Sequence, residues 1–118
     1  MSTAAHIVVA LIGLLHIYIL VLEMFLWTKP AGLRAFGQTR ENAEITKVLA
    51  ANQGLYNGFL AAGLLWGVWL GPAGNSVKVF FLLCVLVAGL YGAATASRKI
   101  LFIQAVPALI GLALVALS

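Results

Sequence analysis

Four apolar runs, each about 18–24 residues long, constrain the fold of this chain more than any other feature. They extend over about residues 4–27, 48–70, 76–96 and 100–117, with short polar connections between them. A helix of that length crosses the roughly 30 Å of hydrocarbon in a bilayer. Because the runs are continuous and do not alternate, they exclude the strands of a transmembrane barrel. The sequence therefore predicts an all-α fold: a transmembrane four-helix bundle forming one integral membrane domain over residues 1–118.

The composition leads to the same class of protein. The chain has 118 residues, of which 64% are hydrophobic and 8% are charged. A soluble domain of this size could not cover its surface with so few charges, so the expected partner is the lipid bilayer. The net charge of +4 does not indicate nucleic acid, because the basic residues lie in the short connections. The N-terminal MSTAAHIVV has no basic segment, so we expect the first run to remain in the mature protein.

The few metal-binding residue types do not form a recognisable site. Cys84 is the single cysteine, which rules out an intramolecular disulfide and a cysteine-based metal centre. His6 and His16 are ten residues apart, and residues at that spacing do not share a helix face. We therefore predict no metal ion, with a haem held between histidines of two subunits as the remaining alternative.

The distribution of basic residues predicts the orientation. The first and third connections hold six of them, whereas the termini and the second connection hold Lys78 alone. The positive-inside rule places those two connections in the cytoplasm and both termini outside, in an inner or plasma membrane. Trp27 then marks the inner interface, and Trp66 and Trp69 the outer one. The six residues are Lys29, Arg34, Arg40, Lys47, Arg98 and Lys99.

The connection over residues 28–47 is the longest. Its second half, RENAEITK, is expected to extend the second apolar helix toward the headgroups. Thr39 or Asn42 would cap that extension, with Glu41 and Glu44 near the positive end of the helix dipole.

The stretch ANQGLYNG opens the second run with an unusual group of polar side chains. At 3.6 residues per turn its polar positions fall on one helix face, next to two glycines in a G-x-x-x-G spacing. A polar face on a membrane helix is costly unless it meets partners or water, so we expect these side chains to bind a ligand. The polar residues are Asn52, Gln53, Tyr56 and Asn57, and the glycines are Gly54 and Gly58.

Glu23 is the one acidic residue inside an apolar run. A carboxylate in a membrane span is a functional-site hypothesis by default, and pairing with a loop arginine or lysine is the structural alternative. His16 lies near mid-membrane on the same helical stripe. It is either a proton relay or ligand contact, or, as we prefer, a neutral residue that hydrogen-bonds across helices.

The remaining candidates lie near the junction of the third and fourth runs. Tyr91, Thr95 and Arg98 occupy one stripe at i, i+4 and i+7, and Gln104 lies just inside the fourth run. Pro107 should kink that run and free a carbonyl near residue 103. With the predicted orientation, the polar residues of all four runs lie at one depth, which predicts a pocket open to the cytoplasm.

Two resemblances add to this interpretation. LHIYILVLEMFLW, TKPAGLRAFG, ANQGLYNGFLAAGL and VAGLYGAATASRKILFIQAVPALIGL together cover most of the chain. They resemble a bacterial and fungal family of small four-span proteins that is catalogued as a domain of unknown function, number thirteen hundred and four. That resemblance implies a fold but no activity.

The second resemblance is to the MAPEG superfamily, the membrane-associated proteins of eicosanoid and glutathione metabolism. Asn52 and Tyr56 match an Asn and a Tyr of that family, Tyr91 and Arg98 match its later Tyr and Arg residues, and Gly54 or Leu55 takes the place of its Glu. The resemblance implies a homo-oligomer, a trimer, with a cytoplasmic glutathione site between subunits.

These observations define a working hypothesis and two alternatives. The hypothesis is a pocket for a small polar or amphipathic ligand, in which glutathione or another thiol supports transfer or isomerisation on a lipophilic substrate. Arg98 would stabilise a thiolate, Tyr91 or Tyr56 would donate a hydrogen bond, and Glu23 would act as acid–base or hold the amine of the cofactor. Asn52, Gln53 and Gln104 would position it. The alternatives are a small proton-coupled transporter or channel using Glu23 and His16, similar to small multidrug resistance transporters, and a non-catalytic assembly or stress protein.

Overall fold

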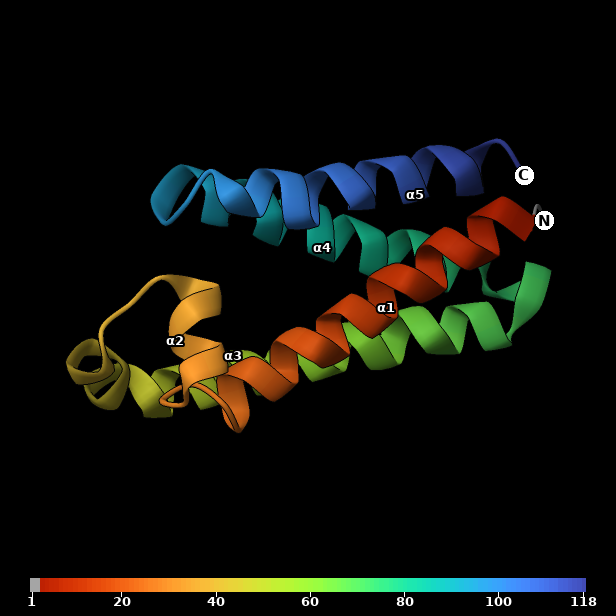
Figure 1. The fold of residues 1–118 in the computed structure, drawn as a ribbon. Helices are drawn as coiled ribbons and strands as arrows, with labels where there is room; N and C mark the ends of the chain where they lie inside the picture. The colour runs from red at the N-terminus through yellow and green to blue at the C-terminus, as the bar shows by residue number, and fades with distance from the viewer. Residues whose placement is uncertain (1–2) are drawn as a thin grey trace. The chain divides into compact units, whose positions relative to one another are not determined.

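The computed structural model describes residues 3–118, and in that range its regular elements are all helical, which confirms the all-α prediction. Figure 1 shows the elements in chain order. They are α1 (Thr3–Met24), α2 (Pro30–Phe36), α3 (Arg40–Trp69), the 3₁₀ turn η1 (Gly71–Gly74), α4 (Asn75–Thr95), the π-helical turn η2 (Leu101–Ala105) and α5 (Val106–Ala116).

Two of the described helical segments are long and apolar enough to cross a membrane. They are Thr3–Met24 and Gly71–Thr95, and Leu101–Ala116 is apolar but shorter. The 30-residue helix α3 is long enough but does not belong to this group. Its first part carries charged residues, and the polar side chains of ANQGLYNG interrupt the part that follows.

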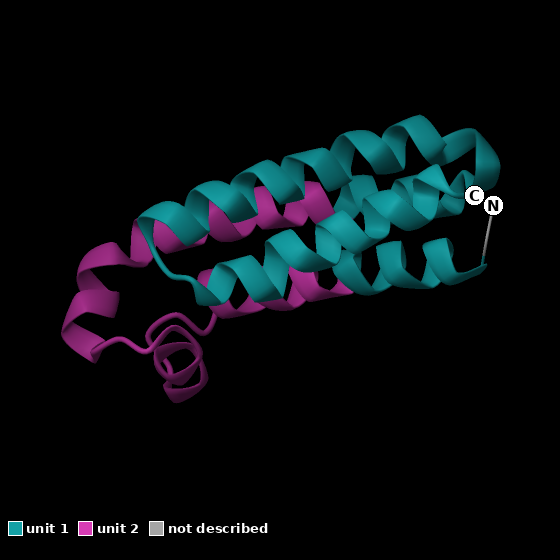
Figure 2. Ribbon diagram, turned by 90° about the horizontal axis from the view of Figure 1, so that it is seen from above, with its two compact units in different colours: residues 1–13, 62–118 teal, residues 14–61 magenta. Residues whose placement is uncertain are grey.

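The chain divides into two compact units, coloured separately in Figure 2. Unit 1 comprises residues 1–13 and 62–118, and unit 2 comprises residues 14–61. Both α1 and α3 pass from one unit into the other, so each unit contains part of both helices.

In unit 1, α4 and α5 form a closely packed pair connected by a short turn. A Cβ added at Gly89 would lie 2.9 Å from the backbone nitrogen of Ala105, so glycine allows this close approach. The π-helical turn η2 ends at Ala105, two residues before Pro107. Proline lacks an N–H and its ring crowds the preceding turn. The π-helical turn widens the helix at the place where the sequence predicts a kink.

The hairpin between α3 and α4, also in unit 1, depends on glycine. Gly71 has a φ of 66°, a left-handed conformation in which a side chain would be strained. A Cβ at Gly74 would lie 2.2 Å from the carbonyl oxygen of Gly67, and one at Gly67 would lie 2.7 Å from Cγ of Lys78. These glycines bring the end of α3 against the start of α4.

In unit 2, the second half of α1 packs against α3 through the G-x-x-x-G pair. A Cβ at Gly54 would lie 2.6 Å from Cγ of Met24, and one at Gly58 would lie 2.7 Å from Cδ1 of Leu20. Ala61 continues this buried face one turn later. The small residues let the two helix backbones approach closely, which is the role of such spacing in membrane helices.

The connection between α1 and α3 contains a helix, α2, that the sequence analysis did not predict. Pro30 occupies its first turn, and Gly37 ends it with a φ of 60°. Gly32 lies against the backbone of Leu26, so α2 packs tightly onto the turn that follows α1. The next helix begins as predicted, because the hydroxyl of Thr39 accepts a hydrogen bond of 3.2 Å from the backbone N–H of Asn42.

Candidate functional site

The centre of the candidate site is a hydrogen bond between α1 and α3 in unit 2. The side-chain amide of Asn57 donates to Oε1 of Glu23 at 2.6 Å. The same amide donates to the backbone carbonyl of Gln53 at 3.2 Å, which fixes its orientation on α3. Glu23 is only 7% exposed. A buried carboxylate is therefore held in place by an amide.

The position of this pair follows from the packing of the glycines. Gly54, Asn57 and Gly58 are at i, i+3 and i+4, so they share the face of α3 that meets α1. A Cβ at Gly54 would lie 3.2 Å from Cβ of Glu23. The close approach that these glycines allow brings the short side chain of Asn57 within reach of the carboxylate.

The other polar residues of ANQGLYNG do not point the same way. Asn52, Gln53 and Tyr56 are exposed, and Tyr56 packs edge-on against Phe59 at a centroid distance of 5.7 Å. Helical periodicity predicts that all four polar side chains share one face. In the structure, α1 packs on the side of α3 that carries Gly54 and Gly58. Of the four polar residues, only Asn57 lies on that side.

His16 is fully buried in α1, seven residues before Glu23 and within unit 2. His16 and Glu23, which share one helical stripe in the sequence, are both buried. The structure pairs Glu23 with the amide of Asn57 and not with a loop arginine or lysine.

The candidates on the later helices belong to unit 1. Tyr91, Thr95 and Arg98 are exposed. The hydroxyl of Thr95 donates to the carbonyl of Tyr91 at 2.7 Å, a local bond that satisfies the hydroxyl within its own helix. Gln104 donates from Nε2 to the carbonyl of Val85 at 3.2 Å, so its amide links η2 to α4. Glu23, Asn52, Gln53, Tyr56, Asn57 and His16 belong to unit 2.

Tyr91 also lines a shallow depression of about 630 Å³ along the exposed face of α4. The lining is almost entirely apolar and comprises Phe80, Leu83, Cys84, Val87, Ala88 and Tyr91. Such a surface suits a hydrocarbon chain better than a polar cofactor.

Lys78 is the polar residue whose role sequence reasoning missed. It is fully buried at the start of α4 in unit 1. Its Nζ donates to the carbonyl of Gly71 at 3.0 Å and to Oδ1 of Asn75 at 3.2 Å. A cation beside the carbonyls that follow α3 is favourable, because the C-terminal end of a helix is partially negative. Gly67, eleven residues earlier, has no side chain and so leaves room for the aliphatic part of Lys78. It is the one feature of the sequence that could have indicated this burial.

No group of three or more His, Cys, Asp and Glu side chains within residues 3–118 is arranged to hold a metal ion. The polar cluster on α1 and α3 offers one carboxylate and one amide. Its chemistry is that of hydrogen bonding and charge pairing.

The family described as "Protein of unknown function (DUF1304)" matches residues 10–116. The chain belongs to the DUF1304 family. Its resemblance to that family, noted from the sequence, is thereby confirmed. The DUF1304 chain is also similar to the uncharacterized protein YpaA of Lactococcus lactis subsp. lactis (strain IL1403), with 31% identity over 119 residues, covering 99% of this chain and 96% of YpaA. No solved structure matches the chain.

Proposed function

We propose that this DUF1304 protein is a multi-pass protein of the inner or plasma membrane that binds a small polar or amphipathic ligand at Glu23 and Asn57. One observation carries the proposal. The Glu23 carboxylate is 7% exposed, and within residues 3–118 its one hydrogen-bond donor is the neutral amide of Asn57.

An ionised Glu23 carries a negative charge inside the protein. An amide donor orients a carboxylate but does not neutralise it, and a buried charge needs either a counter-charge or a proton. Oε1 of Glu23 is occupied by Asn57, whereas Oε2 accepts no hydrogen bond from the described residues. An ammonium group of a ligand would supply both the positive charge and a donor for the second oxygen.

Exposed apolar surface supports the membrane part of the proposal. The long helix α1 carries Ile7, Leu11, Leu14 and Tyr18 on one stripe at i, i+4, i+7 and i+11, and each is more than half exposed. Phe80 and Val87 on α4 are similarly exposed. Contiguous apolar faces of this kind are unfavourable in water and favourable against lipid. The apolar depression beside Tyr91 is also better suited to lipid chains than to water.

Glutathione is the first ligand to test, because it has an amine and a thiol and because the MAPEG resemblance implies it. If the ligand is a thiol cofactor, the proposed assembly is a trimer, as the MAPEG resemblance implies. Native mass spectrometry in detergent gives the subunit number, and a dimer would count against the MAPEG analogy.

The test is thermal unfolding of the detergent-solubilised protein with and without glutathione. A ligand at a hundredfold excess over its Kd stabilises by about 2.7 kcal/mol, which corresponds to a Tm increase of roughly 10 °C for a domain of this size. We expect this shift for the wild type and its loss in Glu23→Gln, which keeps the shape of the side chain but removes its charge.

Two controls define the result. Glutathione acetylated on its amine should give no shift, because it lacks the group that would meet Glu23. Glu44→Gln, at an exposed carboxylate already paired with Lys47 at 3.1 Å, should keep the full shift. If wild-type protein shows no shift with glutathione or with other thiols, the thiol-cofactor proposal fails.

A small proton-coupled transporter is the second candidate, and the same buried carboxylate favours it. A proton is the other way to neutralise Glu23, and intramembrane carboxylates commonly serve as proton carriers. In proteoliposomes with an imposed pH gradient, Glu23→Gln would abolish uptake of the transported cation while Glu44→Gln would leave it unchanged. Uptake that is equal in wild type and Glu23→Gln would exclude this candidate. If the thermal-shift test and the uptake test both fail, a non-catalytic assembly role remains.

A further inference from the structure

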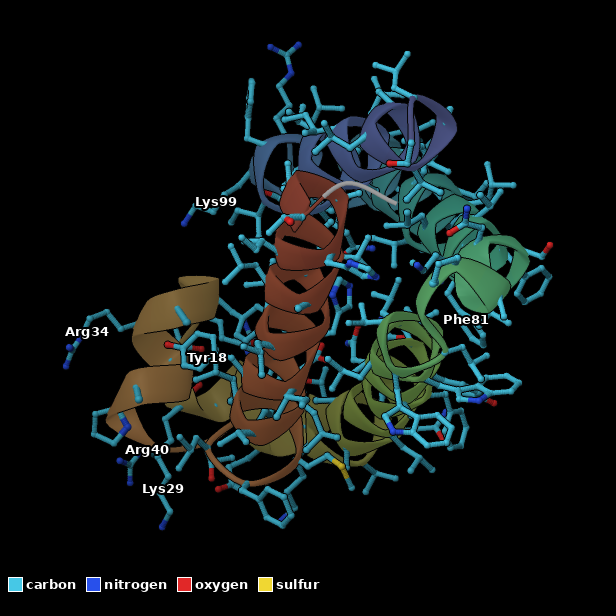
Figure 3. The ribbon with its side chains drawn as sticks, turned by 90° about the vertical axis from the view of Figure 1, so that its right-hand side faces the viewer. Tyr18, Lys29, Arg34, Arg40, Phe81 and Lys99 are labelled. Carbon is cyan, nitrogen blue, oxygen red and sulfur yellow. The ribbon has the colours of Figure 1, made fainter. Side chains whose placement is uncertain are left out.

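The connection between α1 and α3 carries basic side chains that extend away from the protein. Lys29, Arg34 and Arg40 are all exposed, and Figure 3 shows the three side chains extending away from the ribbon of unit 2. Within the part of the chain that the structure describes, the one ion pair joins Lys47 to Glu44. The three outward cations therefore have no carboxylate partner, although Glu41 is a nearby exposed acid in the first turn of α3.

The backbone that carries these cations is held in place and is not an open loop. Gly32 packs directly against Leu26 in the turn that follows α1, and Gly37 closes α2 in a left-handed conformation. The backbone N–H of Leu33 donates to the carbonyl of Lys29 at 2.9 Å. Because α2 is fixed on that turn, Lys29 and Arg34 are presented from a defined surface.

Aromatic residues precede and follow the basic residues in the same part of the chain. The rings of Trp27 and Phe36 are 4.9 Å apart at their centroids, and Nε1 of Trp27 donates to the hydroxyl of Thr46 at 3.2 Å. Phe25 is 67% exposed. A tryptophan with a satisfied N–H and exposed phenylalanines are side chains typical of membrane–water interfaces. Basic and aromatic groups together fit a headgroup region better than bulk water.

We propose that Lys29, Arg34 and Arg40 form a docking surface for the phosphate of an anionic phospholipid in the leaflet that faces this connection. Charge complementarity supports this occupant, because the connection over residues 28–47 has four basic and two acidic residues, one of the acids paired with Lys47. The planar guanidinium groups of Arg34 and Arg40 match the oxygens of a phosphate in two-point geometry. The surface is separate from Glu23 and acts whether or not that site binds a ligand.

Trp27 provides the readout. In a Trp66→Phe/Trp69→Phe background it is the one tryptophan. The protein is placed in bilayers containing phosphatidylglycerol and phosphatidylcholine, with bromine on the chains of one lipid or the other. We expect brominated phosphatidylglycerol to quench Trp27 more strongly at equal mole fraction. Each basic residue near an anionic surface contributes about a fivefold preference, so Arg34→Gln should lower the ratio of association constants about fivefold. Replacing all three basic residues by Gln should bring the ratio of the association constants for phosphatidylglycerol and phosphatidylcholine close to one.

Lys47→Gln is the matched control. It removes one positive charge from the same connection, but that ammonium is already engaged by Glu44 at 3.1 Å. We expect its ratio to stay within about twofold of the parent, and 1 M salt to reduce the preference in the parent protein by screening. Circular dichroism verifies that each variant stays helical. Equal quenching by both brominated lipids would overturn the proposal, and so would equal losses in Arg34→Gln and Lys47→Gln, which would indicate a general effect of net charge.

Discussion

At the scale of single residues, the pairing of Glu23 with Asn57 sets the energetics of unit 2. A carboxylate buried without a donor is strongly unfavourable, and the 2.6 Å hydrogen bond from Asn57 offsets part of that cost. Asn57 itself remains half-buried beside Gly54 and Gly58, and its second hydrogen bond keeps it from turning away. The pair thus depends on the close contact of the helices, and the contact depends on two residues without side chains.

Glu23 could be identified as a candidate from the sequence, but its partner could not. A helical projection puts Asn52, Gln53, Tyr56 and Asn57 on one broad arc, and nothing in that projection says which edge meets another helix. The glycines carry that information only once α1 is known to pack on them. Lys78 shows the same limit, because its burial depends on a turn whose geometry comes from Gly71 and Gly74.

The first prediction concerns this hydrogen bond. Asn57→Ala should lower the free energy of unfolding by about 1–3 kcal/mol, because it leaves the buried carboxylate without its donor. In a Glu23→Met background the same substitution should cost much less, since no charge then remains unsatisfied. Chemical unfolding in detergent of the wild type, both single variants and the double variant gives a coupling free energy, expected at about 1–3 kcal/mol.

Asn52→Ala is the control for that cycle. Its side chain is exposed and makes no hydrogen bond to Glu23, so it should change the free energy of unfolding by less than about 0.5 kcal/mol. Additive effects of Glu23→Met and Asn57→Ala would contradict the pairing described above.

At the scale of elements, the long helices were predictable and the short one was not. Continuous apolar runs led to α1, α4 and the helix over η2 and α5, and Thr39 marked the start of α3. By contrast α2 has seven residues, which are too few for a periodic pattern, and its proline and glycines resemble a loop. This helix is held by the contact of Gly32 with the backbone of Leu26. Such a contact cannot be read from the residue types of the segment alone.

The second prediction tests that contact. In Gly32→Ala the new Cβ would lie 2.0 Å from the carbonyl oxygen of Leu26, so α2 must move away from α1. Displacement exposes the backbone around Arg34, which is followed by Ala35 and is therefore a trypsin site. We expect limited trypsin digestion in detergent to cut this connection at least several times faster in Gly32→Ala than in the wild type.

Ala31→Ser is the neighbouring control, because residue 31 is exposed and has room for a larger side chain. It should leave the cleavage rate unchanged. Equal rates in all three proteins would mean that α2 does not depend on its contact with α1.

At the scale of the whole molecule, the basic residues bear on the orientation that we propose for the chain in a membrane. Six basic residues lie in the first and third connections, and the single one elsewhere, Lys78, is buried with its ammonium bound to Gly71 and Asn75. These neutral oxygens satisfy the hydrogen-bond donors of Lys78 but leave its charge in place. The bias of six basic residues against one agrees with the proposed orientation, in which the first and third connections face the cytoplasm.

The third prediction follows from that bias and from the length of α4. Its 21 residues rise about 31 Å, the thickness of the hydrocarbon layer, so Ala73 before it and Ser97 after it should lie on opposite sides of the membrane. Both residues are exposed. In a Cys84→Ala background, a membrane-impermeant maleimide should label Ala73→Cys in intact spheroplasts and Ser97→Cys only after permeabilisation. The reverse pattern would invert the orientation, and labelling of both before permeabilisation would show that α4 does not span, because no barrier would then separate its two ends.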